Sequence, residues 1–312
     1  MIVLNSFNSL LEVVEYFYDE EISLKFLTYK RWNNNITCPH CGGDKIYSFK
    51  DNKRYKCSSC YKQFTAKVGT IFEGSKIPLQ KWYIAIYLLT AHKKGISSHQ
   101  LSRDLKVTQK TAWFLLHRIR FALSQGTFNT SIGGQNNIVE IDETFIGGKN
   151  KNRHSYKKVE SSQGRSYKDK VPILGMIERG GILKAMKVKN TQADTLQPII
   201  ENYVHSNTVV MTDEWWGYKK LHRAFTEHSF INHGKSEYVN GSVHTNTIEG
   251  FWSLFKRSIF GIYHSASHKH IQHYVDEAVF RYNTRKINNE DRLHLLMSFV
   301  NTRLKYNELI KR

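Results

Sequence analysis

Three acidic residues in the second half of the chain are candidates for metal-dependent chemistry. Asp142 lies in the alternating segment IVEIDE, Asp213 ends an apolar run, and Glu249 lies in a segment with helical periodicity. Carboxylate oxygens favour Mg²⁺ or Mn²⁺, and two such ions about 4 Å apart can hold the attacking and leaving oxygens of a phosphodiester. The residue types therefore predict two catalytic Mg²⁺ or Mn²⁺ ions held by Asp142, Asp213 and Glu249.

The segment around Glu249 carries other polar residues at helical spacing. Asn246 precedes Glu249 by three residues, so both share a helical face, and either could supply the third ligand; a carboxylate binds a divalent cation better, which favours Glu249. Lys256 follows seven residues after Glu249, which leaves it about 20° out of register on that face and roughly 10 Å farther along the axis. Lys256 and its neighbour Arg257 are therefore expected to contact DNA phosphates rather than the metal.

Other side chains near these acids could compete for the same roles. Glu140 shares the face of Asp142 and stays an alternative ligand, whereas alternation points Glu143 away. Aromatic residues near the acids could stack on unpaired bases, but their helical spacing favours the core. They are Trp215, Trp216, Trp252 and Tyr263.

All four cysteines lie within 23 residues, in a C-x2-C-x15-C-x2-C pattern: Cys38, Cys41, Cys57 and Cys60. Two C-x-x-C knuckles can point four thiolates at one Zn²⁺, which predicts a structural zinc ribbon with no open position for catalysis. The stretch between the knuckles alternates apolar with basic residues, as expected for a hairpin with a cationic face. His40 lies inside a knuckle and could compete, but the complete cysteine set favours a bystander role.

The elements that would position the acids follow a recognisable order. An initial strand precedes a hairpin, a helix that contains Pro198, a buried strand that ends at Asp213, a helix that opens at Trp215, and a longer helix that opens at His244. This order, with one Asp on the first strand and another at the end of the fourth, predicts an α/β domain of the RNase H-like class.

A helical region lies between the cysteines and this domain. A helix follows Pro78, Ser97 or Ser98 caps a short helix, and Thr108 caps another after a turn at Lys106. These features predict a helix-turn-helix, with an ordinary helical bundle as the alternative. The residues expected to contact DNA are Gln109, Lys110, Arg118 and Arg120.

The predicted organisation has five parts. They are an N-terminal helical segment (1–35), the zinc ribbon (36–68), the helix-turn-helix segment (69–124), a linker (125–136) and the RNase H-like catalytic domain (137–312).

Composition independently points to a polyanionic partner. The formal net charge is +19, and the excess lies in residues 42–120 (+12), the loop 149–170 (+6) and the tail 251–312 (+6). Such charge drives association with nucleic acid by counterion release and predicts steep salt sensitivity. The longest apolar run falls far below the roughly 20 residues that span a bilayer, so we expect a cytoplasmic, nucleoid-associated protein without a membrane partner.

Together these motifs resemble the DDE transposases of bacterial insertion sequences that carry an N-terminal zinc ribbon. The segments that carry the resemblance are RW at 31–32, CPHCGG, GTIFEGSKIPLQKW at 69–82, VEIDETFIGG, TDE at 212–214 and HTNTIEGFWSLFKRSIFGIYH. The resemblance implies binding of double-stranded DNA at terminal inverted repeats, cleavage, strand transfer to target DNA, and at least a homodimer to pair two ends. Asp142, Asp213 and Glu249 would be metal ligands, although some members have Asn as the third residue. The alternatives are a domesticated or inactive DNA-binding regulator and an RNase H-like nuclease.

Overall fold

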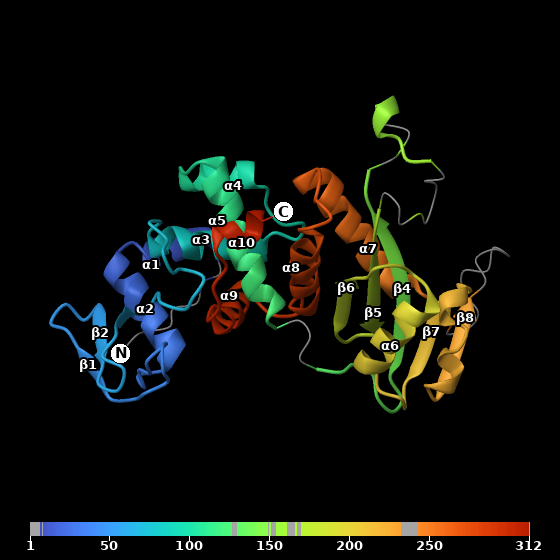
Figure 1. The fold of residues 1–312 in the computed structure, drawn as a ribbon, viewed down its shortest axis with the longest axis horizontal. Helices are drawn as coiled ribbons and strands as arrows, with labels where there is room; N and C mark the ends of the chain where they lie inside the picture. Colours follow the sequence, from blue (N-terminus) through green and yellow to red (C-terminus); the bar gives the residue numbers. More distant parts are fainter. Residues whose placement is uncertain are drawn as a thin grey trace. The chain divides into compact units, whose positions relative to one another are not determined.

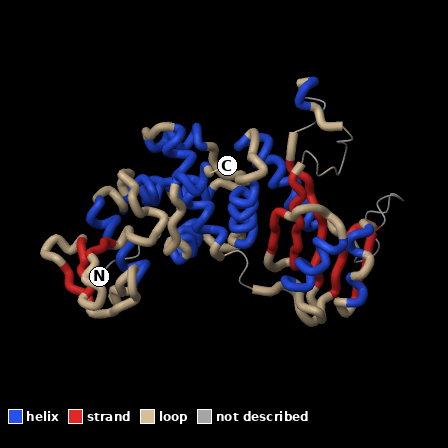
Figure 2. Tube along the Cα trace, in the orientation of Figure 1, coloured by secondary structure: helices blue, strands red, loops and turns tan. Residues whose placement is uncertain are grey.

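The computed structural model describes residues 7, 9–126, 130–148, 150, 154–160, 166, 170–231 and 243–311. Contacts divide the chain into two compact units. The first joins Met1–Gly126 with Thr284–Arg312, and the second is Thr127–Asn283. Figure 1 labels their elements and Figure 2 separates helix from strand; each unit is described by itself below.

The first unit begins with two helices and a small antiparallel sheet. Arg31, near the end of the second helix, donates to the Ala66 carbonyl at 2.8 Å, and Trp32 packs on the sheet's core. In the central strand Tyr55 and Cys57 are buried and Arg54 and Lys56 exposed, so the predicted hairpin with a cationic face is confirmed. A third strand joins it. The elements are α1 (Leu10–Tyr16), α2 (Glu20–Trp32), β1 (Ile46–Ser48), β2 (Arg54–Cys57) and β3 (Gln63–Thr65).

The two helices of the predicted helix-turn-helix form with the expected caps. The Ser97 hydroxyl accepts from the Gln100 amide at 3.1 Å, and Thr108 accepts from the Thr111 amide at 3.2 Å. Lys106 ends the first of them in the left-handed region, with φ of 50°, and so makes the predicted turn. The helices are α3 (Leu79–Ala91), α4 (Ser98–Leu105) and α5 (Gln109–Ser124).

The C-terminal segment differs from prediction because it packs with the first unit rather than with the large sheet. α9 (Asn289–Ser298) contacts α2 and α3, and the short α10 (Tyr306–Ile310) follows it. The Asn289 amide lies 3.3 Å from the Tyr87 hydroxyl, and the Ile71 amide donates to the Val300 carbonyl. The predicted domain 137–312 therefore includes 29 residues that belong elsewhere, Thr284–Arg312.

The second unit is built on a five-stranded sheet in the order β6-β5-β4-β7-β8. β4 pairs antiparallel with β5 and parallel with β7, so the first strand in sequence lies at the centre. The predicted initial strand, hairpin, helix with Pro198 and buried strand are all present. The strands are β4 (Ile138–Ile146), β5 (Val171–Glu178), β6 (Leu183–Lys187), β7 (Val209–Asp213) and β8 (Glu227–Ile231).

Helices cover both faces of this sheet (Figure 1). One core lies between the sheet and α7 and α8, and the other between the sheet and α6 with two short 3₁₀ turns. The helix expected at Trp215 is only a 3₁₀ turn. The elements are α6 (Ala193–Tyr203), η2 (Ser155–Lys157), η3 (Trp216–Tyr218), η4 (Leu221–Arg223), α7 (Asn246–Ser258), the π-helical η6 (Ile259–Tyr263) and α8 (Ile271–Asn283).

The linker and the basic loop of the prediction are described only in part. Residues 127–129 lie outside the described residues, but Ile132 is buried and forms a parallel bridge with Val204, so this part of the expected linker belongs to the second unit. Of the loop 149–170, only 150, 154–160, 166 and 170 are described.

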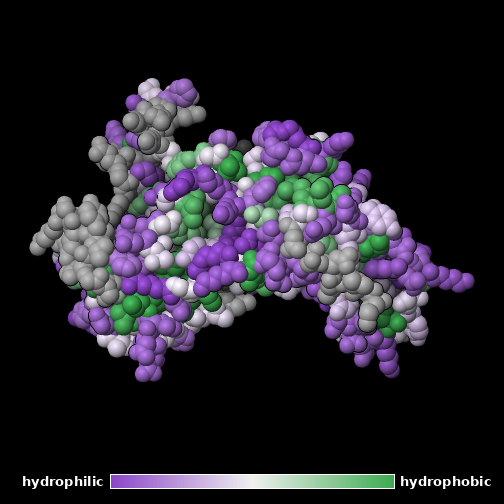
Figure 3. All heavy atoms as spheres, turned by 180° about the vertical axis from the view of Figure 1, so that it is seen from behind, coloured by the Kyte–Doolittle hydropathy of each residue, from purple (hydrophilic) through white to green (hydrophobic). Residues whose placement is uncertain are grey.

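The face of the molecule in Figure 3 is mostly hydrophilic, with smaller hydrophobic areas between the polar side chains. No helix in the described part of the chain is both long and apolar enough to cross a bilayer.

Candidate active site

The central pair of parallel strands brings the two aspartates together. Ile138 pairs with Val209 and Glu140 with Met211, so the same register continued to the strand end brings Asp142 level with Asp213. Residues paired in this way point to the same side of a sheet. Asp213 is 4% exposed, and its Oδ1 accepts a hydrogen bond from the Trp215 amide at 3.0 Å, which fixes the orientation of this carboxylate.

The pKa of Asp142 is affected by the neighbouring acidic residues. Burial raises the pKa of Asp142 well above its usual value, and the negative charges of Glu143, Asp213 and Glu249 raise it further. Three predicted ligands from β4, β7 and α7 therefore act on one another across the same small region. A cluster of carboxylates that repel one another is the arrangement that a divalent cation would stabilise.

Glu249 and Asn246 both lie exposed in the first turn of α7. The Thr245 hydroxyl donates to Glu249 Oε1 at 2.8 Å and orients this carboxylate. The charge of Glu249 contributes to the raised pKa of Asp142, which places Glu249 near this carboxylate.

Glu140, which the sequence left open as an alternative metal ligand, has a different role in the structure. It is fully buried, and its carboxylate accepts from the backbone amides of Thr247 and Ile248 at 2.9 and 3.0 Å. Arg179 Nε donates to it at 2.7 Å, and the Thr247 hydroxyl at 2.8 Å. Since these contacts occupy both oxygens, the alternative of Glu140 as a metal ligand is wrong for this structure: it caps the N-terminus of α7.

This cap explains how Thr245 can hold Glu249. Thr245 is the N-cap residue of α7 by position, yet its side chain makes no capping bond to the helix backbone. Glu140 takes that function from the neighbouring strand, so the Thr245 hydroxyl is available to orient Glu249. The Arg179 guanidinium also donates to the His244 carbonyl at 2.9 Å and so ties β5's end to the chain entering α7.

Gly175 allows α7 to approach the sheet closely. It pairs with Asp142 across β4 and β5. A Cβ at this position would lie 2.5 Å from Trp252 Cζ2 and 3.0 Å from Ile248 Cδ1, both on α7. The absence of a side chain beside Asp142 thus sets the distance between the helix with Glu249 and the strand with Asp142.

Glu143 points away from Asp142, as alternation predicted. Its Oε2 accepts from the Tyr218 hydroxyl at 2.5 Å, on the α6 side of the sheet. Burial and the charge of Glu143 both raise the pKa of Tyr218 well above its usual value, so this hydroxyl stays a donor.

The four cysteines form a much tighter group. Their sulfur atoms all lie within 4.8 Å of one another, and the pairs Cys38–Cys60 and Cys41–Cys57 are 3.6 Å apart. A regular zinc tetrahedron with Zn–S bonds of about 2.3 Å separates its sulfurs by about 3.8 Å, so the donors fit Zn²⁺. Backbone hydrogen bonds from Cys60 and Ser59 lower the pKa of Cys57 to about 6 against the opposing effect of burial. A backbone hydrogen bond from Gly43 lowers the pKa of Cys41, but the neighbouring sulfurs together raise this pKa to about 12. The fit to Zn²⁺ therefore rests on the arrangement of the four sulfurs.

The carboxylates do not form such a group. Among the described residues, the sets of three or more ligand atoms within 4.8 Å of one another do not include Asp142, Asp213 and Glu249 together. Ligands shared between two cations about 4 Å apart are spread more widely than the ligands of one ion. The donor set therefore fits hard divalent cations by its chemistry and mutual repulsion.

The predicted DNA-contacting residues divide into exposed and buried ones. Gln109 and Lys110 are exposed in the first turn of α5, and Lys256 and Arg257 are exposed near the end of α7. The expected location of the four side chains at the surface is thus observed.

Arg118 and Arg120 require correction, because they are only 4% and 1% exposed. The Arg118 guanidinium donates to the Glu73 carbonyl at 2.5 Å and lies over the rings of Trp82 and Phe114. Burial lowers the pKa of Arg118 to about 10. All six residues from Leu115 to Arg120 are buried, so this part of α5 is enclosed on every side and its arginines are buried with its apolar residues. Their charge gave no sign of this in the sequence.

Sequence reasoning missed Arg179, Gly175, Thr245 and Tyr218 as residues that build the site. Gly175 interrupts an otherwise apolar strand, which signals a close approach and could have identified it. Trp252 and Tyr263 lie in the core with α7 and α8, and Trp215 packs against the core on the α6 side, so the predicted core position is confirmed for these three. It is wrong for Trp216, which is exposed.

The comparisons with known proteins agree with this fold. Residues 134–283 match the ISXO2-like transposase domain, and residues 18–63 match the transposase zinc-ribbon domain. The chain is 30% identical over 256 residues to an uncharacterized protein in the transposable element ISH50 of Halobacterium salinarum, covering 78% of this chain and 84% of that protein. It is 29% identical over 103 residues to an uncharacterized transposase-like protein of Haemophilus influenzae, covering 33% and 82%.

The fold and the acidic cluster define a DDE-type transposase domain, preceded by a zinc ribbon. The chain belongs to the insertion-sequence transposases with an ISXO2-like transposase domain.

Proposed function

We propose that the protein binds the terminal inverted repeats of its element and cleaves and joins DNA strands with Asp142, Asp213 and Glu249 as ligands of two Mg²⁺ or Mn²⁺ ions. The observation that carries this proposal is the strand register, which brings Asp142 level with Asp213, beside the close contact that Gly175 allows between β5 and α7, the helix with Glu249. In agreement, burial and the charges of Asp213 and Glu249 raise the pKa of Asp142. When bound, the cations supply Lewis acidity at the scissile phosphodiester and neutralise developing negative charge.

The chain's own residues prepare this site. Glu140 and Arg179 fix the start of α7, Thr245 orients Glu249, and the strand register aligns Asp142 with Asp213. Of Asn246 and Glu249, we assign Glu249 as the third ligand because a carboxylate binds a divalent cation better and because Thr245 orients this carboxylate. Lys256 and Arg257 hold substrate phosphates farther along α7.

We assign end recognition to the zinc ribbon and the helix-turn-helix. Their surface supplies exposed cations, among them Lys56 and Arg54 on β2 and Lys110 at the start of α5. The N-terminal turn of a second helix is the part that reads base edges in this motif, which suits Gln109 and Lys110. Pairing of two ends requires at least two copies of the chain, acting on DNA in the cytoplasm at the nucleoid.

The proposal is tested by cleavage of labelled duplexes that carry the element's ends, in Mg²⁺, with Asp213→Asn and the matched exposed control Asp194→Asn on α6. Asp213→Asn should lower the cleavage rate by about 1,000-fold, equivalent to several kcal/mol of charge stabilisation, with DNA binding retained. Asp194→Asn should cleave like the wild type. Normal cleavage and strand transfer by Asp213→Asn would refute the assignment; binding without cleavage by the wild-type chain would favour the regulator alternative.

A further inference from the structure

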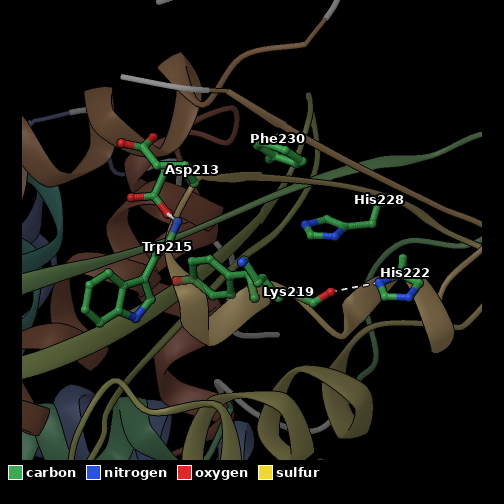
Figure 4. Close-up of a pocket in the computed structure, with 8 residues that line it drawn as sticks. Asp213, Trp215, Lys219, His222, His228 and Phe230 are labelled. Atoms are coloured by element: carbon green, nitrogen blue, oxygen red, sulfur yellow. Dashed lines mark hydrogen bonds between the residues drawn. The ribbon is translucent and has the colours of Figure 1, made fainter. Parts of the chain in front are cut away.

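A pocket lies beside Asp213 that the carboxylate chemistry does not use. Its volume is ≈ 290 Å³, at the lower end of the range of about 300–1,000 Å³ typical of small-ligand sites. Figure 4 shows Asp213 and Trp215 toward one end of the row of side chains, His222 and His228 toward the other, and Lys219 and Phe230 between them. The lining residues are Asp213, Glu214, Trp215, Tyr218, Lys219, His222, His228 and Phe230.

The strand register places this pocket relative to the acids. Thr212 pairs with Phe230 and Val210 with His228, so these four side chains share one face of the sheet. Val210 belongs to the core on the α6 side, opposite α7. The pocket thus lies on the face opposite Glu249, and Asp213, at the end of β7, belongs to both the pocket and the carboxylate cluster.

The walls of the pocket are held in place by the rest of the unit. The Trp215 indole donates to the Thr191 carbonyl at 2.8 Å, and the Tyr218 hydroxyl is bound to Glu143. Gly217 lets this indole pack closely, since a Cβ there would lie 2.9 Å from Trp215 Cδ1. The aromatic walls are therefore fixed before any ligand enters, which reduces the entropic cost of binding.

The chemistry of the lining suits a flat, aromatic ligand with an attached anion. Phe230 is 59% exposed on the edge strand, a large apolar ring left at the surface beside a polar site. Lys219 is exposed and lines the pocket, so it supplies a cation beside the site for a phosphate. Its Nζ lies over the exposed Trp216 ring.

His228 adds a specific hydrogen-bonding group. The Thr212 hydroxyl donates its one proton to the Asp213 carbonyl at 2.8 Å, so in its 3.0 Å contact with His228 Nε2 it accepts. Burial and the nearby His222 lower the pKa of His228, which favours the neutral ring. A neutral ring with the proton on Nε2 leaves Nδ1 as an acceptor, a group that can receive an amino or imino hydrogen.

We propose that this pocket takes one unpaired nucleobase from the DNA strand whose phosphodiester lies at Asp213. This inference rests on the proposed function, because it needs DNA at the carboxylates. A pocket of this size holds one ring system and excludes a duplex. Stacking on aromatic rings contributes about 1–3 kcal/mol per base, which offsets the few kcal/mol needed to unpair it.

The test compares equilibrium binding of the full chain and Phe230→Ala to duplexes that span the cleavage point of the element's own end, in Ca²⁺. One abasic nucleotide is moved through the three positions on either side of that point. The ratio of the Kd of Phe230→Ala to the Kd of the wild type should be about tenfold on intact DNA, as expected for one lost stack. At one position, removal of the base should reduce the ratio to about one.

The matched control is Phe260→Ala, which removes another exposed phenylalanine, 52% exposed, from the same unit outside this pocket. Its ratio to the wild type should not depend on whether any base is present. A Phe230→Ala ratio that is the same at every abasic position, whether tenfold or one, would overturn the nucleobase pocket. Cleavage in Mg²⁺ is measured separately and decides the proposed function. The dependence of the Kd ratio on the abasic position is measured without cleavage, so each proposal can fail while the other holds.

Discussion

The zinc-ribbon site and the carboxylate site differ in how the chain assembles them. The four sulfurs come from two knuckles within residues 38–60 and lie within 4.8 Å of one another. The three carboxylates come from β4, β7 and α7, and their geometry depends on packing between these elements. A local site needs only its ligands at the right spacing, whereas a long-range site also needs residues such as Glu140 and Gly175 that bring its elements together.

Removal of zinc should produce the largest change and confine it to the local site. Structural zinc binding in small ribbons contributes about 10 kcal/mol or more to folding, so Cys57→Ser or chelation should unfold the ribbon. Amide hydrogen exchange should show loss of protection over Arg54–Cys57 and retained protection over β4 and β7. His40→Ala is the matched control, since His40 lies in the knuckle outside the four-sulfur group, and it should retain one zinc per chain. A chelated protein that kept its ribbon protection would contradict this view.

Loss of the buried cap should disturb the long-range site more than loss of a surface acid. Glu140→Gln leaves Arg179 without its buried partner and weakens acceptance from two α7 amides, at an expected cost of about 3 kcal/mol in the free energy of unfolding. The amides of Thr247 and Ile248 should exchange faster. Glu201→Gln, an exposed change on α6, should alter stability by less than about 0.5 kcal/mol. Unchanged exchange at both amides in Glu140→Gln would show that Glu140 does not position α7.

A single methyl group at Gly175 should have the next largest effect. Gly175→Ala forces Trp252 and α7 away from β5, with an expected loss of about 1–3 kcal/mol in unfolding free energy from overpacking. The control Gly250→Ala lies on α7, where nothing is within 4 Å of the new Cβ, and should instead stabilise the protein by about 0.5–1 kcal/mol. Urea unfolding measures both, and a Gly175→Ala protein as stable as the wild type would contradict close packing at this point.

The smallest expected effect is a pH dependence of the free energy of unfolding of the protein without Mg²⁺ or Mn²⁺. The pKa of Asp142 is raised in the folded state, so the folded chain binds more protons and stability falls as pH rises above the unfolded value of about 4. Asp142→Asn should therefore melt at a higher temperature than the wild type at pH 7 in buffer without Mg²⁺ or Mn²⁺ and without chelator, and this advantage should disappear near pH 3. A variant with no advantage at pH 7 would mean that the carboxylates do not repel one another in solution.

These contrasts explain which features the sequence could predict. The cysteine spacing, the caps at Ser97 and Thr108, and the strand order around Asp142 and Asp213 are local signals, and the structure contains them. Burial of Arg118 and the transfer of Thr284–Arg312 to the first unit depend on contacts between distant segments, which periodicity does not encode. The sequence left Glu140 open as a ligand for the same reason, because its partners Thr247 and Ile248 lie more than 100 residues away on α7 and Arg179 lies on another segment.

The most direct test of the central claim is anomalous scattering from a crystal of the full chain soaked with Mn²⁺. We expect manganese peaks bound by carboxylate oxygens of Asp142, Asp213 and Glu249, with Glu140 still capping α7. Manganese bound by Glu140, or by Asn246 in place of Glu249, would contradict the ligand assignment. A crystal with no manganese beside Asp142 and Asp213 would contradict the claim that these carboxylates form a divalent-metal site.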